Sequence, residues 1–266
     1  MEPVDIKRFK DVSIHPRLPR IIAHRGASLE APENTLPAFQ RALDLGADGI
    51  EFDVLLTSDK VPVVTHNDDL SILTHFNGYV HSTPFETVRA LDVGSHFHTS
   101  TAGITMPTMV EVLELMSRHD VLTIVEIKAQ AGMKKSAAEL IGGIISDIRM
   151  HGPIVISSSS FKIIKELKHR FPTIPRALIV KRTPFPFFPL SIFAKHEQVC
   201  ALHVYMKALW PSLVKKMKKL GEVYAWTVNE PDEFDTCLSL EIDGIITDDV
   251  AFAKKHLQGI SAALTV

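Results

Sequence analysis

Residues 49–66, GIEFDVLLTSDKVPVVTH, place two strand-like runs close together, GIEFDV at 49–54 and VPVVTH at 61–66. Both runs are rich in Val and Ile and apolar nearly throughout, which is typical of strands buried on both faces. The link from Asp53 to Val61 is too short for the helix that joins two neighbouring parallel strands. We therefore expect that one run lies outside the regular parallel sheet, or that one turn of the sheet is irregular.

Similar runs alternate with longer amphipathic segments along the rest of the chain. Counting these two, nine runs are strand-like: 21–24, 49–54, 61–66, 122–128, 154–159, 176–180, 199–204, 222–228 and 243–248. Strand–helix alternation over about 250 residues indicates an α/β fold with parallel strands, and the length favours a TIM (β/α)8 barrel. A barrel needs only eight strands, and a doubly wound sheet is the alternative fold.

The alternation of strand-like and amphipathic segments divides the chain into one large domain and two short ends. We expect a polar leader at 1–19, the barrel at 20–258 and a short tail at 259–266. Residues 70–107 interrupt the alternation with a mixed segment rich in His, Thr and Gly, which predicts a small insertion between the third strand and its helix.

Composition excludes several classes of protein. Of the 266 residues, 45% are hydrophobic and 23% are charged, and the formal net charge is -2, so no basic field attracts nucleic acid and no such partner is expected. Cys200 and Cys237 are too few for a disulfide framework or a zinc site. We see no signal-peptide h-region and no apolar run long enough to span a bilayer, so we expect a cytoplasmic protein.

Carboxylates recur at the carboxyl ends of the strand-like runs, where barrel enzymes place their active sites. Glu51 and Asp53 are two residues apart and therefore share one face of their strand, and Glu126 and Lys128 repeat this spacing two strands later. Three carboxylates without a sulfur ligand predict a site for one divalent cation, Mg²⁺ or Ca²⁺. An ion-pair network inside the barrel is the alternative.

The same rim carries basic and titratable side chains. Arg25 and Lys128 suit an anion such as a phosphate, although Arg25 could instead pair with Glu33 or Glu51. His24 and His66 end the first and third runs and could serve as the acid and the base that cleavage of a phosphodiester needs. Most of the 13 histidines must be bystanders, but these two share the rim with the carboxylates.

An ordered set of motifs resembles the glycerophosphodiester phosphodiesterase family: HRGASLEAPENT, GIEFDVLLTSDKVPVVTH, VEIK, AWTVN and DGIITD. The resemblance implies a TIM barrel with a small insertion after the third strand. It also implies a reaction that releases glycerol 3-phosphate and an alcohol from a glycerophosphodiester. In that reaction the glycerol hydroxyl of the substrate attacks the phosphorus, and water opens the resulting cyclic phosphate.

The resemblance also implies roles for individual residues. The metal ligands would be Glu51, Asp53 and Glu126, and the catalytic pair would be His24 and His66. Arg25 and Lys128 would hold the phosphate, and Trp226 would line the pocket. One position departs from the family pattern, because Asn67 stands where an Asp usually follows the histidine. If that Asp normally orients the histidine or contacts the metal, Asn67 weakens this role, unless Asp68 takes it over.

The segment 184–193, PFPFFPLSIF, is either a loop packed on the core or an exposed apolar patch. Lys181, Arg182 and Lys195 flank it and would favour the anionic head groups of a membrane or a lysolipid. Three functions therefore stand side by side: a metal-dependent glycerophosphodiesterase, a lysophospholipase D-like enzyme, and a non-catalytic barrel that binds a phosphate or a lipid.

Overall fold

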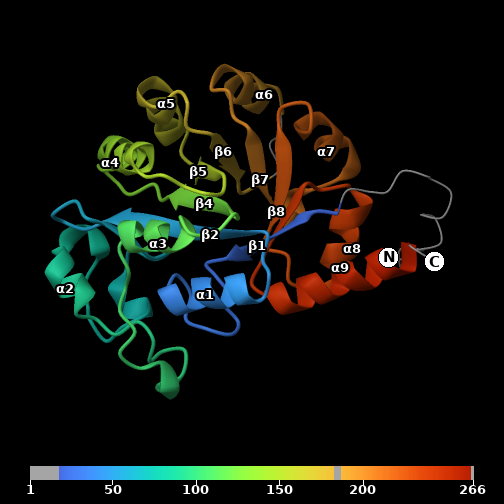
Figure 1. The fold of residues 1–266 in the computed structure, drawn as a ribbon. Helices are drawn as coiled ribbons and strands as arrows, with labels where there is room; N and C mark the ends of the chain where they lie inside the picture. Colours follow the sequence, from blue (N-terminus) through green and yellow to red (C-terminus); the bar gives the residue numbers. More distant parts are fainter. Residues whose placement is uncertain (1–17, 183–186, 265–266) are drawn as a thin grey trace.

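The computed structural model describes residues 18–182 and 187–264, and its centre is a closed barrel of eight parallel strands (Figure 1). The strands are β1 Arg20–His24, β2 Gly49–Leu56, β4 Leu122–Ile127, β5 Ile154–Ser158, β6 Arg176–Val180, β7 Ala201–Tyr205, β8 Glu222–Trp226 and β9 Gly244–Thr247. Because β1 pairs with both β2 and β9, the sheet has no open edge. The predicted TIM barrel is confirmed, and the doubly wound alternative is excluded.

The ninth strand, β3 Pro62–Val64, lies outside the barrel and pairs antiparallel with β2. The link before it is a tight turn, in which Thr57 N donates to Val61 O at 3.1 Å and Lys60 adopts a positive φ of 68°. The short link therefore produces a hairpin, as its length predicts. Because β3 leaves the barrel, β4 is the direct neighbour of β2, and Glu126, two strands later along the chain, lies beside Asp53.

Helices surround the barrel and cover its outer face, as Figure 1 shows. They are α1 Leu36–Asp44, α3 Met109–Met116, α4 Lys134–Asp147, α5 Phe161–Arg170, α6 Phe187–His196, α7 Pro211–Met217, α8 Pro231–Ser239 and α9 Val250–Leu264. The last helix extends through residues 259–264, which were expected to form a tail. Of the expected leader, residues 1–17 lie outside the described part of the chain.

Helix α1 fixes the loop that follows β1. Thr35 caps it, since its side chain accepts a hydrogen bond from Ala38 N, and the buried Ala38 and Phe39 face the barrel. Phe39 packs on Phe52 of β2 with a ring separation of 5.7 Å. Full burial of a side chain of this size stabilises the fold by about 2–3 kcal/mol. The helix therefore anchors the loop that carries Arg25.

The insertion forms a lobe between β3 and α3, coloured teal to green in Figure 1. It contains α2 Phe85–Arg89 and the short 3-10 helices η2 Leu70–Ile72, η3 Val80–Ser82 and η4 Thr99–Thr101. A separate cluster of buried apolar side chains supports it: Leu55, Val63, Leu70, Val80, Val88, Val93 and Met106. Arg89 binds both carboxylate oxygens of Glu111 at 2.6 Å, which joins the lobe to α3.

The interior of the barrel changes character along its axis. Its middle is an apolar layer that includes Ile22, Ile124, Ala177 and Ile246. Two residues further along β4, the interior position is occupied by Glu126, so charge gathers at the carboxyl ends of the strands. Across the two described ranges, no helix has both the length and the apolar character needed to cross a membrane.

Candidate active site

Three carboxylates meet at the carboxyl end of the barrel. Glu51 and Asp53 project from β2 with 4% and 1% of their surface exposed, and Asp53 is the register partner of Glu126 on β4. One ligand oxygen from each of Glu51, Asp53 and Glu126 lies within 4.8 Å of the other two. The structure therefore brings together the three residues predicted as metal ligands.

The charges around this cluster are only partly balanced. Lys128 Nζ lies 3.1 Å from Asp53 Oδ1 and 3.1 Å from Glu126 Oε1. Burial raises the pKa of Asp53, but the nearby charges of Lys128 and Arg25 outweigh it and hold that pKa below its usual range. Burial and the charge of Asp53 raise the pKa of Glu126. The ion-pair network considered as an alternative is therefore present around two of the three carboxylates.

Glu51 is the carboxylate that this network leaves uncompensated. Its shortest hydrogen bond within residues 18–182 and 187–264 comes from Arg25 N at 3.4 Å, and no ion pair reaches it there. Burial, followed by repulsion from Asp53 and Glu126, raises its pKa well above the usual value. A buried carboxylate in this state calls for a cation, and an all-oxygen donor set fits a hard divalent ion.

Arg25 is held rigidly at the rim. Its guanidinium Nη1 donates to both carboxylate oxygens of Glu33, at 3.0 and 3.1 Å, and its Nε lies 3.3 Å from Asp53 Oδ2. Glu33, which was expected as an alternative partner of Arg25, therefore does form an ion pair with it. Gly26 follows with φ of 86°, and a Cβ there would lie 2.7 Å from the backbone of Ala38. Glycine at this position lets α1 pack against the loop.

His24 is oriented by Asp248, a strand-end carboxylate to which the sequence assigned no role. Its Nδ1 lies 2.7 Å from Asp248 Oδ1, and Asp248 also accepts hydrogen bonds from Ser28 Oγ at 3.1 Å and Asn229 Nδ2 at 2.7 Å. Burial raises the pKa of Asp248, but these hydrogen bonds outweigh it and lower the pKa to about 2. An ionised Asp248 holds the proton on Nδ1 of His24, so Nε2 is the nitrogen that can exchange a proton.

His66 is oriented by Asn67. Its Nδ1 lies 3.0 Å from Asn67 Oδ1, so the amide oxygen accepts the hydrogen bond that a carboxylate could accept. Asp68 faces the insertion instead, where it accepts hydrogen bonds from His81 N at 3.1 Å and Gln130 Nε2 at 3.3 Å. The departure from the family pattern therefore leaves the ring of His66 supported, and it no longer favours a non-catalytic barrel.

Both imidazoles lie near the carboxylate cluster. The charges of His66 and His24 each contribute to lowering the pKa of Asp53. Burial lowers the pKa of His66, and the negative charge of Asp53 opposes that effect. The two predicted catalytic histidines and the three predicted ligands therefore belong to one site.

Other polar groups complete the site. Trp226 ends β8, with its ring 5.4 Å from that of Tyr205, and its buried Nε1 has no hydrogen-bond partner among the described residues. The same holds for Ser157 Oγ, on the register partner of Glu126. Asn34 Nδ2 donates to Asp53 Oδ2 at 3.1 Å, although its sequence PENT indicates only a helix start.

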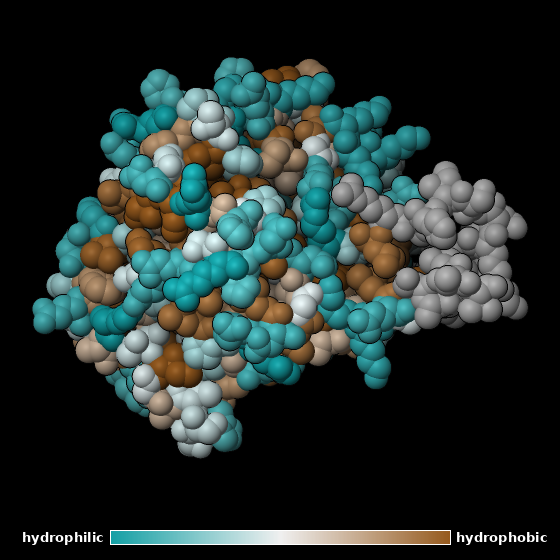
Figure 2. All heavy atoms as spheres, in the orientation of Figure 1, coloured by the Kyte–Doolittle hydropathy of each residue, from teal (hydrophilic) through white to brown (hydrophobic). Residues whose placement is uncertain are grey.

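The apolar segment 184–193 is described from Phe187 onward, and residues 184–186 lie outside the described part. Phe187 and Phe193 pack against the core, whereas Phe188 and Ile192 of α6 are 71% and 53% exposed. Phe161 of α5, 48% exposed, stacks on Phe193 with ring centroids 4.1 Å apart. Figure 2 shows hydrophobic surface where α6 reaches the upper edge of the molecule. From Phe187 onward the segment is therefore a helix and not a loop, with some apolar side chains packed on the core and others exposed.

Comparison with known proteins gives a consistent result. The profile of the glycerophosphoryl diester phosphodiesterase family matches residues 24–252. The glycerophosphodiester phosphodiesterase of Caldanaerobacter subterraneus subsp. tengcongensis is 33% identical over 230 residues, which cover 86% of this chain and 93% of that protein.

Solved structures agree with these sequence matches. A phosphodiesterase from Oleispira antarctica in complex with the product sn-glycerol-3-phosphate has a TM-score of 0.85 and 27% identity, with 91% of this chain and 97% of that chain covered. The glycerophosphodiester phosphodiesterase of Thermotoga maritima has a TM-score of 0.71 and 26% identity, with 91% and 99% covered. The chain belongs to the glycerophosphoryl diester phosphodiesterase family.

Proposed function

We propose that this protein hydrolyses glycerophosphodiesters to glycerol 3-phosphate and an alcohol, with one divalent cation, Mg²⁺ or Ca²⁺, bound by Glu51, Asp53 and Glu126. The observation that carries the proposal is the approach of three ligand oxygens to within 4.8 Å, beside two oriented imidazoles. When bound, the ion would polarise a phosphoryl oxygen and neutralise charge that develops in the transition state.

The basic side chains at the carboxyl end of the barrel, Arg25 and Lys128, would bind the phosphate. Lys128 is fixed between Asp53 and Glu126 at 3.1 Å from each, so its ammonium group is placed before the substrate arrives. Arg25 is fixed by Glu33 in the same way. Preorganised charges of this kind stabilise a phosphorane-like transition state without further rearrangement.

Two histidines move the protons. His24 would take the proton of the attacking glycerol hydroxyl at Nε2, because Asp248 holds its other nitrogen and stabilises the imidazolium that forms. His66 would give a proton to the leaving oxygen, and Asn67 Oδ1 orients its ring for that transfer. In the second step water opens the cyclic phosphate, the two histidines exchange roles, and both return to their starting states.

A panel of metals and substrates tests this function. The protein is stripped with EDTA and assayed without metal, with Mg²⁺ and with Ca²⁺ on glycerophosphocholine and glycerophosphoethanolamine, with release of glycerol 3-phosphate as the readout. We expect turnover only with a divalent ion, and we expect His24→Ala to abolish it while the protein stays folded. Full activity after removal of metal would contradict the cation site.

A lysophospholipase D-like activity is the second candidate, favoured by the exposed Phe188 and Ile192 of α6 beside Phe161. An acyl chain could lie along these side chains. The test compares lysophosphatidylcholine with glycerophosphocholine in the wild type and in Phe188→Ser. Equal or faster turnover of the deacylated substrate, unchanged by the substitution, would exclude this candidate. Contact of the same patch with an anionic membrane would appear as binding to phosphatidylserine vesicles that Phe188→Ser weakens.

A cytoplasmic location is also part of the proposal. It is supported by the two cysteines, since both Cys200 and Cys237 carry free thiols and Cys200 is exposed. Free exposed thiols suit a reducing compartment. Fractionation of cells that produce the protein, with a cytoplasmic and an envelope marker, would test it.

A further inference from the structure

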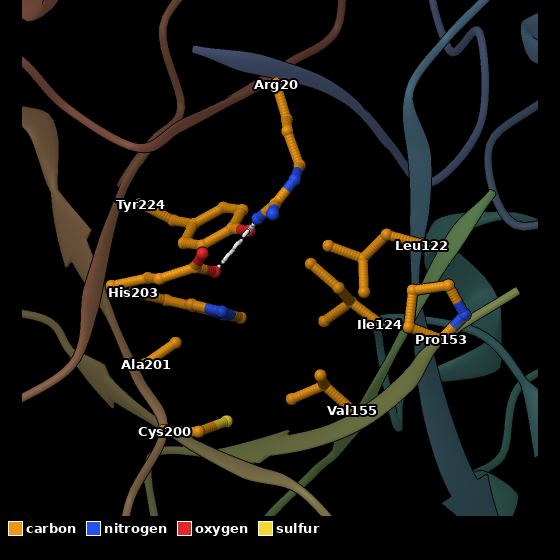
Figure 3. A pocket seen from close by; sticks show the side chains of 10 residues that line it. Arg20, Leu122, Ile124, Pro153, Val155, Cys200, Ala201, His203 and Tyr224 are labelled. Carbon is orange, nitrogen blue, oxygen red and sulfur yellow. Dashed lines mark hydrogen bonds and ion pairs between the residues drawn. The ribbon is translucent and has the colours of Figure 1, made fainter. Parts of the chain in front are cut away.

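A cavity opens at the opposite end of the barrel from the carboxylates (Figure 3). Its volume is about 230 Å³. Arg20, Leu122 and Glu222 are the first residues of β1, β4 and β8, and Pro153 and Cys200 directly precede β5 and β7. The cavity is therefore the amino-terminal mouth of the barrel, and the family resemblance assigns nothing to it.

The cavity has one polar wall and one apolar wall. Figure 3 shows Arg20, His203 and Tyr224 on one side, facing Leu122 and Ile124 across the empty space. The polar wall includes a closed network, since Arg20 Nη1 donates to Glu222 Oε2 at 2.9 Å and Tyr224 Oη donates to the same oxygen at 3.0 Å. Because Arg20 and Glu222 neutralise each other, the wall offers no net charge to an ion.

His203 is the unsatisfied group of this wall. It lies on β7 with 2% of its surface exposed, and its ring points into the cavity in Figure 3. No hydrogen bond reaches either ring nitrogen from the residues that the structure describes. Burial lowers its pKa to about 4, so the ring is neutral and offers one N–H donor and one bare nitrogen. The ring nitrogens are not among the fully enclosed polar atoms that lack a partner, so they are accessible from the cavity and can bond to a molecule that enters it.

We propose that this cavity binds a small neutral molecule with a compact apolar body and a hydroxyl group, the hydroxyl bonded to His203 and the body packed on Leu122, Ile124 and Val155. A hydroxyl both donates and accepts, so it satisfies either tautomer of the imidazole. An ion would lose its hydration against the apolar wall without gaining a counter-charge. An apolar cavity of about 150 Å³ accommodates benzene, so this one has room for a substituted six-membered ring.

The cavity lies close to the active site along shared strands. Ile124 lines the cavity and Glu126 is two residues further on β4, and Tyr224 and Trp226 have the same relation on β8. Two residues of a strand span about 7 Å. The ligand would therefore contact the strands that also position a carboxylate and the pocket tryptophan, while leaving the catalytic end open.

Phenol and benzene form a matched pair of probes, because they differ by the one hydroxyl group. Calorimetric titration of the full chain should give a Kd for phenol at least tenfold lower than that for benzene. At ten times its Kd, phenol should raise the midpoint of thermal unfolding by about 3 °C. A Kd for phenol above about 10 mM, or equal Kd values for the two probes, would overturn the proposal.

Variants locate the binding. Ala201→Leu and, independently, Val155→Phe fill the cavity and should each remove phenol binding, so one variant that folds is sufficient. His203→Leu should bring the Kd of phenol to within about threefold of that of benzene. Phe188→Ser is the control. It removes an exposed aromatic side chain of α6 that does not line the cavity, so it should leave the Kd of phenol unchanged. Phenol binding that survives both filled variants would overturn the proposal.

Discussion

Asp53 and Glu126 are register partners on the adjacent parallel strands β2 and β4, and Lys128 Nζ lies 3.1 Å from an oxygen of each. This arrangement holds a buried and a half-buried carboxylate together through one ammonium group. It leaves Glu51, on the same face of β2, without an ion-pair partner in the described part of the chain. The three carboxylates can therefore accommodate one further positive charge near Glu51.

Replacing Glu51 separates the cost of its burial from its use as a ligand. In EDTA, Glu51→Gln should stabilise the protein by about 1–3 kcal/mol, because it removes a buried carboxylate without a partner. With metal present, the same variant should bind the ion about 10–100-fold more weakly, and excess metal should partly restore activity. Denaturant unfolding with and without Mg²⁺ measures both effects. Glu114→Gln on the exposed side of α3 is the control, and equal behaviour of the two variants would count against the site.

Lys128→Met should act mainly on the binding of substrate. The substitution removes the ammonium group that we propose holds the phosphate, while the apolar stem stays, so KM for glycerophosphocholine should rise about 10–100-fold. The kcat value should fall less than KM rises. Steady-state kinetics at saturating metal provide the measurement, with the exposed Lys162→Met of α5 as control. An unchanged KM would show that Lys128 serves the carboxylates alone.

Asp248→Asn should reduce kcat by about 10²–10⁴-fold with little change in KM, since the amide no longer holds the reactive tautomer of His24. The neighbouring Asp249 provides a matched control. Its Oδ1 accepts a hydrogen bond from Phe252 N at 2.8 Å in α9 and does not contact His24. Asp249→Asn should therefore keep kcat within about threefold of the wild type. A similar loss in both variants would indicate a general disturbance of this loop.

His203 should make the stability of the protein depend on acid. Its pKa is about 4 in the folded state and about 6.5 when unfolded, so the unfolded chain binds the proton first as the pH falls. Above pH 6.5 this histidine does not reduce the free energy of unfolding. Between about pH 6.5 and 4 the free energy of unfolding falls progressively, because only the unfolded chain takes up the proton. Between pH 7 and pH 4.5 the loss should be about 2 kcal/mol. His203→Leu should show a correspondingly smaller loss in urea unfolding, and identical pH profiles would contradict this prediction.

Periodicity and length were sufficient to predict the barrel. All nine strand-like runs are strands, and the short link between residues 53 and 61 correctly indicated that one of them leaves the barrel. Which strands become neighbours is decided by hydrogen bonds across the closed sheet, and a count along the chain does not reveal it. For that reason the sequence indicated that Glu126 comes two strands after Asp53 along the chain, but not that β4 is adjacent to β2.

The site was predicted where local geometry alone determines it. Glu51 and Asp53 share a face because they are two residues apart, and the structure places both in the interior. The sequence assigned no role to Asn34 and Asp248, because their contacts with Asp53 and His24 depend on how distant loops fold back. Their signal was position, since Asp248 follows the last strand and Asn34 lies in the loop after His24-Arg25. The bond from His66 to Asn67 depends on a side-chain rotamer, which no spacing rule provides.

The lobe between β3 and α3 packs around its own apolar side chains, among them Leu70, Val80 and Met106. Because this small core is separate from that of the barrel, residues on its outer surface can change without disturbing the eight strands. Evolution, or a protein engineer, can therefore vary the outer surface of this lobe while the eight strands and the side chains that they carry stay in place.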